Sequence, residues 1–235
     1  MMLMTAVFIA AGCSKPDEPN NGGDNNGGNN NGGNGGGTIN HEYVDLGLPS
    51  GTLWATCNVG ANAPEEYGDY LAWGETEPKT TYNWDTYKYS NGFEQLTKYC
   101  NDDSWGYNGF TDNLTTLQST DDAATANWGS GWCMPTYEQW EELHQNTSNT
   151  WTTQNGVNGR LYTASNGNSL FLPAAGEYLE DECHGAGGWG GFWSRSLHVD
   201  TPRDAFFLYI NSDRSELSYD DRNMGFSVRP VRSPK

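Results

Sequence analysis

The stretch PTYEQWEELHQNTSNTWTTQNGVNGRLYTASNGNSLFL, residues 135–172, decides the fold class. Its first part predicts a short helix, because Thr136 and Gln139 have the spacing of a capping box at a helix N-terminus. We expect this helix to run to about Gln145. Three large apolar residues share one of its faces and should pack inward: Tyr137, Trp140 and Leu143.

The second part of the same stretch predicts a β-hairpin. Asn166-Gly167 is a strong signal for a tight turn, and we expect Val157–Ala164 before it to pair with Asn168–Leu172 after it. Further short strands are predicted along the rest of the chain, at Glu42–Leu46, Thr52–Ala55, Asp69–Trp73, Gly191–Arg195, Ala205–Asn211, Glu216–Tyr219 and Gly225–Val231.

A second short helix is predicted upstream of the first. It begins at Ser119, with Asp122 three residues later, and ends at Gly129. Residues 76–115 are rich in Thr, Tyr, Asn, Asp and Gly and have weak periodicity, so we expect a long ordered loop region there. Two short helices among many short strands indicate an α+β fold.

The N-terminus has the pattern of a bacterial lipoprotein signal. An apolar run from Leu3 to Ala11 ends in Gly12 and Cys13. The run is too short to span a bilayer but has the length of a signal-peptide core. We therefore expect residues 1–12 to be removed and Cys13 to carry the lipid that attaches the protein to the membrane.

Residues 13–38 are predicted to form a disordered tether. Asp17 and Glu18 resemble the short acidic signal of surface-exported lipoproteins in gut Gram-negative bacteria. From Asn20 to Gly37 the chain contains only Asn, Gly and one Asp, so no apolar group offsets the entropy of ordering. Residues 39–235 then make one folded domain of ordinary size.

The composition limits the classes of partner. The formal net charge is −18, which argues against nucleic acid as a partner, because phosphate backbones need basic surfaces. Only 18% of residues are charged, while 13% are aromatic, including 10 Trp and 13 Tyr. This balance suggests short strands, tight turns and many ordered loops. The acidic charge suits a surface protein and is compatible with the binding of cations or neutral sugars.

Four further cysteines, Cys57, Cys100, Cys133 and Cys183, leave two interpretations open. An even number in an exported protein allows two disulfides with three possible pairings. Free buried thiols are the alternative. Cys183 adjoins His184 and several acidic residues, but a solvated acidic loop is the favoured interpretation there, and we expect no metal site.

Seven ordered blocks cover most of the chain from Glu42 to Arg232: EYVDLGLPSGTLWATCNVGA (42–61), GDYLAWGET (68–76), DDAATANWG (121–129), WCMPTYEQWEEL (132–143), GNSLFLPAAG (167–176), GFWSRS (191–196) and GFSVRPVR (225–232). Together they resemble the Fibrobacter succinogenes-type major paralogous domain, which is common among lipoproteins of gut anaerobes. The resemblance implies a C-type-lectin-like fold related to formylglycine-generating enzymes, with two short helices, short twisted antiparallel sheets and long ordered loops. Cys133 departs from the pattern, which has a large residue such as Arg there.

The residues give little support for an enzyme. Formylglycine-generating enzymes use a cysteine pair near the C-terminus to ligate copper, and no cysteine follows Cys183 here. Ser194, His198 and Asp200 contain the residue types of a triad, but triads are assembled across a fold rather than from neighbours in sequence. We therefore expect no catalytic residue and no cofactor.

Calcium-dependent sugar binding is not signalled either. In the C-type-lectin-like fold it uses Glu-Pro-Asn or Gln-Pro-Asp with a later Trp-Asn-Asp, whose oxygens ligate Ca²⁺. Here Glu77-Pro78-Lys79 places a cation at a ligand position, and Asn83-Trp84-Asp85 has the order changed. Both triplets also precede the helix at 136, which is the wrong half of the chain.

The C-terminal segment is the predicted binding surface. If Phe206, Leu208 and Ile210 face the core, strand alternation sends Phe207 and Tyr209 outward. Cover by a neighbouring loop is the alternative. The segment also resembles the variable face of proteins diversified by retroelements. We predict five ligand contacts, since aromatic residues and Arg are enriched at interfaces: Phe207, Tyr209, Arg214, Tyr219 and Asp221.

The remaining expectations concern the core and the function. The core is predicted to contain Trp54, Trp73, Trp140, Trp193, Phe226 and Val228, with Arg229 in a structural role. The sequence favours a non-enzymatic outer-membrane lipoprotein, exposed on the cell surface, that binds a protein or glycan ligand. The alternatives are a subunit of a surface assembly, or an accessory protein related to formylglycine-generating enzymes or to carbohydrate processing.

Overall fold

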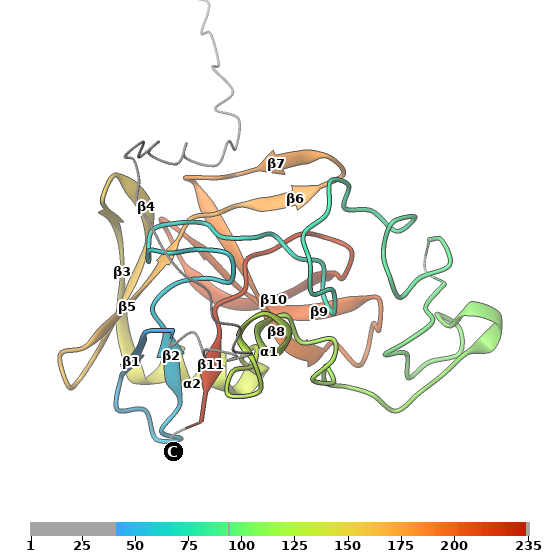
Figure 1. Ribbon diagram of the computed structural model, residues 1–235, viewed down its shortest axis with the longest axis horizontal. Helices are drawn as coiled ribbons and strands as arrows, with labels where there is room; N and C mark the ends of the chain where they lie inside the picture. The colour runs from blue at the N-terminus through green and yellow to red at the C-terminus, as the bar shows by residue number, and fades with distance from the viewer. Residues whose placement is uncertain (1–40, 94, 234–235) are drawn as a thin grey trace, which may run out of the picture. The chain divides into compact units, whose positions relative to one another are not determined.

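Small antiparallel sheets dominate the computed structural model, which describes residues 41–93 and 95–233 (Figure 1). The sheet orders are β1-β2-β11, β10-β9-β8, β3-β4-β5 and β6-β7, and every neighbouring pair is antiparallel. The strands are β1 (Tyr43–Asp45), β2 (Leu53–Ala55), β3 (Thr147–Gln154), β4 (Val157–Ala164), β5 (Ser169–Pro173), β6 (Glu177–Leu179), β7 (Glu182–His184), β8 (Trp189–Leu197), β9 (Asp204–Asn211), β10 (Ser215–Asp221) and β11 (Val231–Arg232).

Two short α-helices, α1 (Ala123–Trp128) and α2 (Tyr137–Asn146), accompany these sheets, with one 3-10 turn, η1 (Tyr107–Gly109). The predicted α+β class is therefore confirmed. The capping box of α2 is present in both directions: Gln139 N donates to Thr136 Oγ1 at 3.2 Å, and Thr136 N donates to Gln139 Oε1 at 2.9 Å. Trp140 and Leu143 of α2 are buried as predicted, whereas Tyr137, the third residue of the predicted inward face, is only half-buried.

Helix α1 starts later than its predicted cap. Asp122, and not Ser119, is the N-cap, and its carboxylate accepts from Thr125 N at 2.9 Å. The same carboxylate accepts from Met134 N at 3.0 Å, so it ties the helix start to the strand-like segment before α2. This second bond needs a tertiary contact, which sequence spacing within the helix does not reveal.

The predicted hairpin is confirmed, with β4 and β5 paired around Asn166-Gly167. Two predicted strands are much shorter than expected. Asp69–Trp73 and Gly225–Val231 meet through a single bridge, Leu71 with Phe226, because Trp73 N next bonds to Arg222 O and leaves the ladder. Strand β3 was not predicted, since its sequence, TSNTWTTQ, carries one large apolar residue.

Two hydrophobic clusters lie on opposite faces of the β8-β9-β10 sheet. Phe207 of β9 belongs to the larger cluster, whereas its neighbours Leu208 and Ile210 belong to the smaller one under α2. All six predicted core residues are buried: Trp54, Trp73, Trp140, Trp193, Phe226 and Val228. The sheet is therefore covered on both sides along much of its length.

Arg229 has the structural role that was predicted. Its side chain is fully buried, and Nε donates to Asn58 Oδ1 at 2.8 Å. Nη1 donates to the carbonyl oxygens of Thr56 and Phe171, both at 3.0 Å. The guanidinium thus joins the loop after β2 to the middle of β5, and burial lowers its pKa to about 9.

Three of the four domain cysteines, Cys57, Cys100 and Cys133, are free thiols. No disulfide therefore joins any two of the four, and the two-disulfide interpretation is wrong for these residues. The free cysteines have different surroundings. Cys100 is buried, with Sγ 3.0 Å from the carbonyl oxygen of Asp102, whereas the backbone of Cys133 forms a β-bridge with Val231.

The predicted signal peptide (1–12), the lipid-attachment residue Cys13 and the tether (13–38) lie outside the described residues. The domain predicted at 39–235 corresponds to one compact unit that begins at His41. Across residues 41–93 and 95–233, no helix has the length and apolar character needed to cross a membrane.

Candidate functional site

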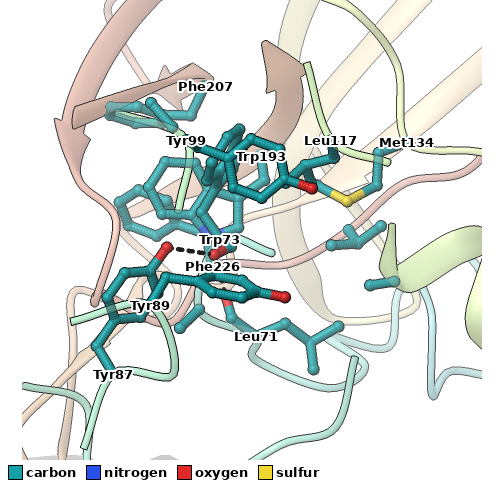
Figure 2. Close-up of a cluster of buried hydrophobic side chains, with 14 of the residues drawn as sticks. Leu71, Trp73, Tyr87, Tyr89, Tyr99, Leu117, Met134, Trp193, Phe207 and Phe226 are labelled. Carbon is teal, nitrogen blue, oxygen red and sulfur yellow. Dashed lines mark hydrogen bonds between the residues drawn. The ribbon is translucent and has the colours of Figure 1, made fainter. Parts of the chain in front are cut away.

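The prediction that Phe207 is an exposed ligand contact is wrong. Only 4% of its surface is exposed, and its ring packs 4.6 Å from Phe226 and 5.9 Å from Trp193, centroid to centroid. Figure 2 shows Phe207 within the large buried cluster. Alternation along β9 does send Phe207 and Leu208 to opposite faces, but each face meets a hydrophobic core.

The other four predicted contacts form two separate pairs. In the β9-β10 register, Tyr209 lies opposite Glu216, while Tyr219 lies opposite Phe206 and Asp221 opposite Asp204. Tyr209 therefore faces one side of the sheet, while Tyr219 and Asp221 face the other side and lie toward the opposite end of it. Arg214 belongs with Tyr209, as described next, so the five predicted residues do not make one site.

At the Tyr209 end of the sheet, the predicted contact residues are already bound to other side chains of the protein. The Tyr209 ring stacks on Trp189 at 5.4 Å and 27°, and Arg214 Cζ lies 5.5 Å from its centroid. Arg214 Nε is also 3.0 Å from Glu216 Oε1. The Tyr209 ring and the Arg214 guanidinium thus have partners within the protein, which leaves little free for a ligand.

The Tyr219 end presents an aromatic surface. Tyr219 is 52% exposed, and its ring stacks on His198 at 4.0 Å and 23°. His198 contacts Phe206 edge-on at 4.9 Å, and Phe206 lies 4.7 Å from Tyr137 at the start of α2. We call these four residues the aromatic platform. Its base is anchored on β9 and α2, while Tyr219 faces solvent.

Hydrogen bonds fix the loop that carries His198. His198 N donates to Asp204 O at 3.2 Å, and Asp204 N donates to Thr201 O at 2.8 Å. The side chains repeat the link, since His198 Nδ1 lies 2.5 Å from Thr201 Oγ1, which donates to Asp204 Oδ2 at 2.8 Å. His198 is therefore held by hydrogen bonds at both its backbone and its imidazole ring.

Asp221 forms an ion pair with the loop that carries His198 and is therefore not free to contact a ligand. Arg203 Nε lies 3.3 Å from Asp221 Oδ1 and 3.5 Å from Asp204 Oδ1, so one guanidinium bridges two carboxylates. Burial, together with the nearby carboxylates of Asp204 and Asp220, raises the pKa of Asp221 to about 6 despite the charge of Arg203. Arg203 also lies over the Trp105 ring at 5.6 Å.

Arg222, which the sequence places beside the predicted surface, is fully buried. Its Nη1 donates to Tyr99 O at 2.9 Å, and its Cζ lies 5.3 Å from the Trp73 ring and 5.5 Å from the Tyr87 ring. Burial lowers its pKa. Arg222 therefore holds the long loop region against the core and does not contact ligand.

An open, acidic groove of about 590 Å³ adjoins the platform. Its walls share the 198–200 segment with the platform, since Val199 and Asp200 directly follow His198. Asn101 Nδ2 donates to Val199 O at 2.8 Å and joins the two walls. The groove is lined by Asn101, Asp102, Asp103, Gly109, Thr111, Val199 and Asp200, which include no basic residue.

The residue types of a catalytic triad are not brought together. His198 Nδ1 bonds to Thr201 rather than to Asp200, and Ser194 is buried, with its Oγ accepting from Ser196 N at 3.1 Å. Among residues 41–93 and 95–233, no three His, Cys, Asp or Glu side chains are grouped so as to hold a metal ion. In the Glu77-Pro78-Lys79 triplet, which resembles a calcium-binding motif, Lys79 forms an ion pair with Glu75, with 2.9 Å between Nζ and Oε1.

Comparisons with known proteins leave the chain without a match: no protein-family model, no curated protein and no solved structure is similar to it at a significant level. The family resemblance of the seven sequence blocks therefore stays a prediction.

Sequence reasoning missed three members of the platform, His198, Phe206 and Tyr137. Phe206 was assigned to the core, and it is half-buried, with its ring 4.7 Å from that of Tyr137, which was also expected to pack inward. His198 was considered only as a triad member. Its contact with Tyr219 depends on the β8-β9-β10 sheet order, which single-sequence patterns do not give.

Proposed function

We propose that this chain is a surface-anchored, non-enzymatic lipoprotein of the outer membrane that binds a protein or glycan ligand through the aromatic platform. The observation that carries the proposal is the exposed Tyr219 ring stacked on a fixed His198. Exposed aromatic rings that are pre-positioned by their neighbours lose little conformational entropy on binding, which makes them effective contacts.

The proposed architecture is a C-type-lectin-like fold of the Fibrobacter-type major paralogous domain. Small antiparallel sheets, two short helices and the long irregular region at 76–115 support it, together with the seven sequence blocks. The proposed anchor is a lipid on Cys13. The net charge of −18 supports a protein or neutral glycan ligand and disfavours an anionic one.

The test is a binding screen on arrays of glycans and bacterial or host surface proteins. The full chain carrying Cys13→Ser is compared with the same chain carrying Tyr219→Ala or Tyr43→Ala. Tyr43 is a matched control, because it is 49% exposed but lies on the β1-β2-β11 sheet. We expect a ligand signal that Tyr219→Ala removes and Tyr43→Ala keeps; equal signals from all three proteins would rule out the platform.

A further inference from the structure

This inference rests on the proposed function. We propose that the ligand is a neutral sugar whose ring packs against Tyr219, and that His198 contacts it directly. His198 Nε2 accepts a hydrogen bond from one of the sugar's hydroxyl groups. Thr201 is then a positioning residue, which acts through His198. The inference deepens the proposed function, because it names the class of ligand and the polar contact that accompanies the aromatic one.

The hydrogen bonds of Thr201 decide which nitrogen of His198 carries the proton. A hydroxyl has one proton, and Thr201 Oγ1 donates it to the carboxylate of Asp204 at 2.8 Å. The same oxygen lies 2.5 Å from His198 Nδ1 and can therefore only accept there. Nδ1 must carry a proton, and in the neutral imidazole Nε2 is then an acceptor.

That acceptor is available to a ligand. Within residues 41–93 and 95–233, the imidazole of His198 forms a hydrogen bond only at Nδ1, and Nε2 is not one of the buried polar atoms that lack a partner. The ring cannot easily turn to offer a different atom, because Thr201 holds Nδ1 and Tyr219 covers one face at 4.0 Å. Phe206 meets the ring edge-on at 4.9 Å. The structure thus presents one fixed acceptor at the edge of an exposed aromatic ring.

A sugar combines the two groups that this arrangement recognises. A pyranose has an apolar face of C–H groups that packs on an aromatic ring, and hydroxyl groups at its edge that donate hydrogen bonds. The adjoining groove adds further acceptor oxygens from Asn101, Asp103 and Asp200. Arg203, which lies in the loop that carries His198, is engaged by Asp204 and Asp221, so its charge is already balanced and does not favour a sulfated or carboxylated sugar.

The tautomer is tested without any ligand. Long-range ¹H–¹⁵N correlation spectra of imidazole rings in the full chain carrying Cys13→Ser identify the protonated nitrogen, and His198→Phe assigns the signal among the four histidines. We expect proton-bearing Nδ1 in the parent and in Thr201→Ser, and a mixture of both tautomers in Thr201→Val. A parent signal from proton-bearing Nε2 would overturn the inference even if the platform binds ligand.

The ligand class is tested with neutral polysaccharides. Migration of the same proteins is measured in native gels containing mannan, xylan or mixed-linkage β-glucan. We expect one of these to retard the parent, Tyr219→Ala to abolish retardation, and His198→Phe, which keeps an aromatic ring, to weaken binding at least tenfold. Loss of one hydrogen bond has about that effect. Thr201→Val should weaken it partially, and Thr201→Ser should restore it.

Two results would separate failure of this inference from failure of the proposed function. If His198→Phe binds the polysaccharide as tightly as the parent while Tyr219→Ala does not, the platform binds sugar but His198 accepts no hydrogen bond. If no polysaccharide retards the parent while a surface protein binds it in a Tyr219-dependent way, the sugar assignment is wrong and the platform is a protein-binding surface.

Discussion

The Tyr219 ring lies 4.0 Å from the His198 ring, with an angle of 23° between their planes. Tyr219 belongs to β10 and His198 directly follows the last residue of β8, so the contact reaches across Phe206 of β9, the central strand of the sheet. Because Tyr219 is the exposed member, substitutions there should change the surface of the protein without changing its core.

Replacing Phe207 with Ala should destabilise the protein by about 3–5 kcal/mol, because it removes a buried ring from the larger cluster. The matched control is Phe93→Ala, since Phe93 is 64% exposed and its loss should change the unfolding free energy by less than about 0.5 kcal/mol. Urea denaturation followed by tryptophan fluorescence measures both. Equal stabilities for the two variants would show that Phe207 is a surface residue after all.

The burial of Phe207 shows what strand alternation can predict from a sequence and what it cannot. The sequence correctly predicts that β9 is a strand and that adjacent residues point to opposite faces. It does not predict which faces are covered, since one is covered by α2 and the other by residues far along the chain, such as Phe226. Coverage is a tertiary property, and alternation is a local one.

Other features could be read from local patterns. The capping box of α2 and the turn at Asn166-Gly167 involve neighbours in sequence, and both are confirmed. The six core aromatic and aliphatic predictions also hold, because large apolar residues within motif blocks are rarely exposed. The aromatic platform needed the order of strands in the sheet, so only its Tyr219 was found in advance.

Replacing Arg229 with Met should cost about 3–5 kcal/mol of unfolding free energy, because it leaves the buried oxygens of Asn58, Thr56 and Phe171 without their donor. Arg214→Met is the control. The Arg214 side chain is 61% exposed and contacts Glu216 and the Tyr209 ring at the surface, so its loss should cost under about 1 kcal/mol. The same denaturation measurement compares them, and a similar cost for both would refute the structural role of Arg229.

Asp121 should stabilise the protein at neutral pH but not in strong acid. Although burial opposes its ionisation, hydrogen bonds from Lys98 and Tyr99, at 2.6 and 2.7 Å, hold its pKa at about 2. A lowered folded-state pKa gives stability that is complete above the unfolded value of 3.8 and is lost as the pH falls through 2.

Asp121→Asn should therefore unfold with about 2 kcal/mol less free energy at pH 7, and the deficit should shrink between pH 4 and pH 2. Asp85→Asn, which changes an exposed carboxylate in the 76–115 region that Asp121 contacts through Lys98 and Tyr99, is the control and should show neither effect. Stability curves at several pH values test this. A deficit that does not change with pH would mean that the Asp121 charge is not what stabilises the loop.

Asp221 should have the opposite pH dependence. Its folded-state pKa is raised to about 6, so the folded protein binds this proton more tightly than the unfolded chain, whose value is 3.8. The associated stability is complete below pH 3.8 and is lost as the pH rises through 6. Compared with the parent, Asp221→Asn should gain about 1–2 kcal/mol between pH 4 and pH 7. A relative loss over that interval would contradict the burial of Asp221 beside Asp204.

The most direct test of the aromatic platform is the dissociation constant of one array-selected ligand for four proteins, measured by isothermal calorimetry at one pH and salt concentration. The proteins are the full chain carrying Cys13→Ser and its Tyr219→Phe, Tyr219→Ala and Tyr43→Ala variants. We predict that Tyr219→Phe and Tyr43→Ala bind within about threefold of the parent, while Tyr219→Ala binds at least about thirtyfold more weakly, equivalent to a hot-spot contact of about 2 kcal/mol. Unchanged affinity in Tyr219→Ala, with the variant folded, would contradict the platform as the binding surface.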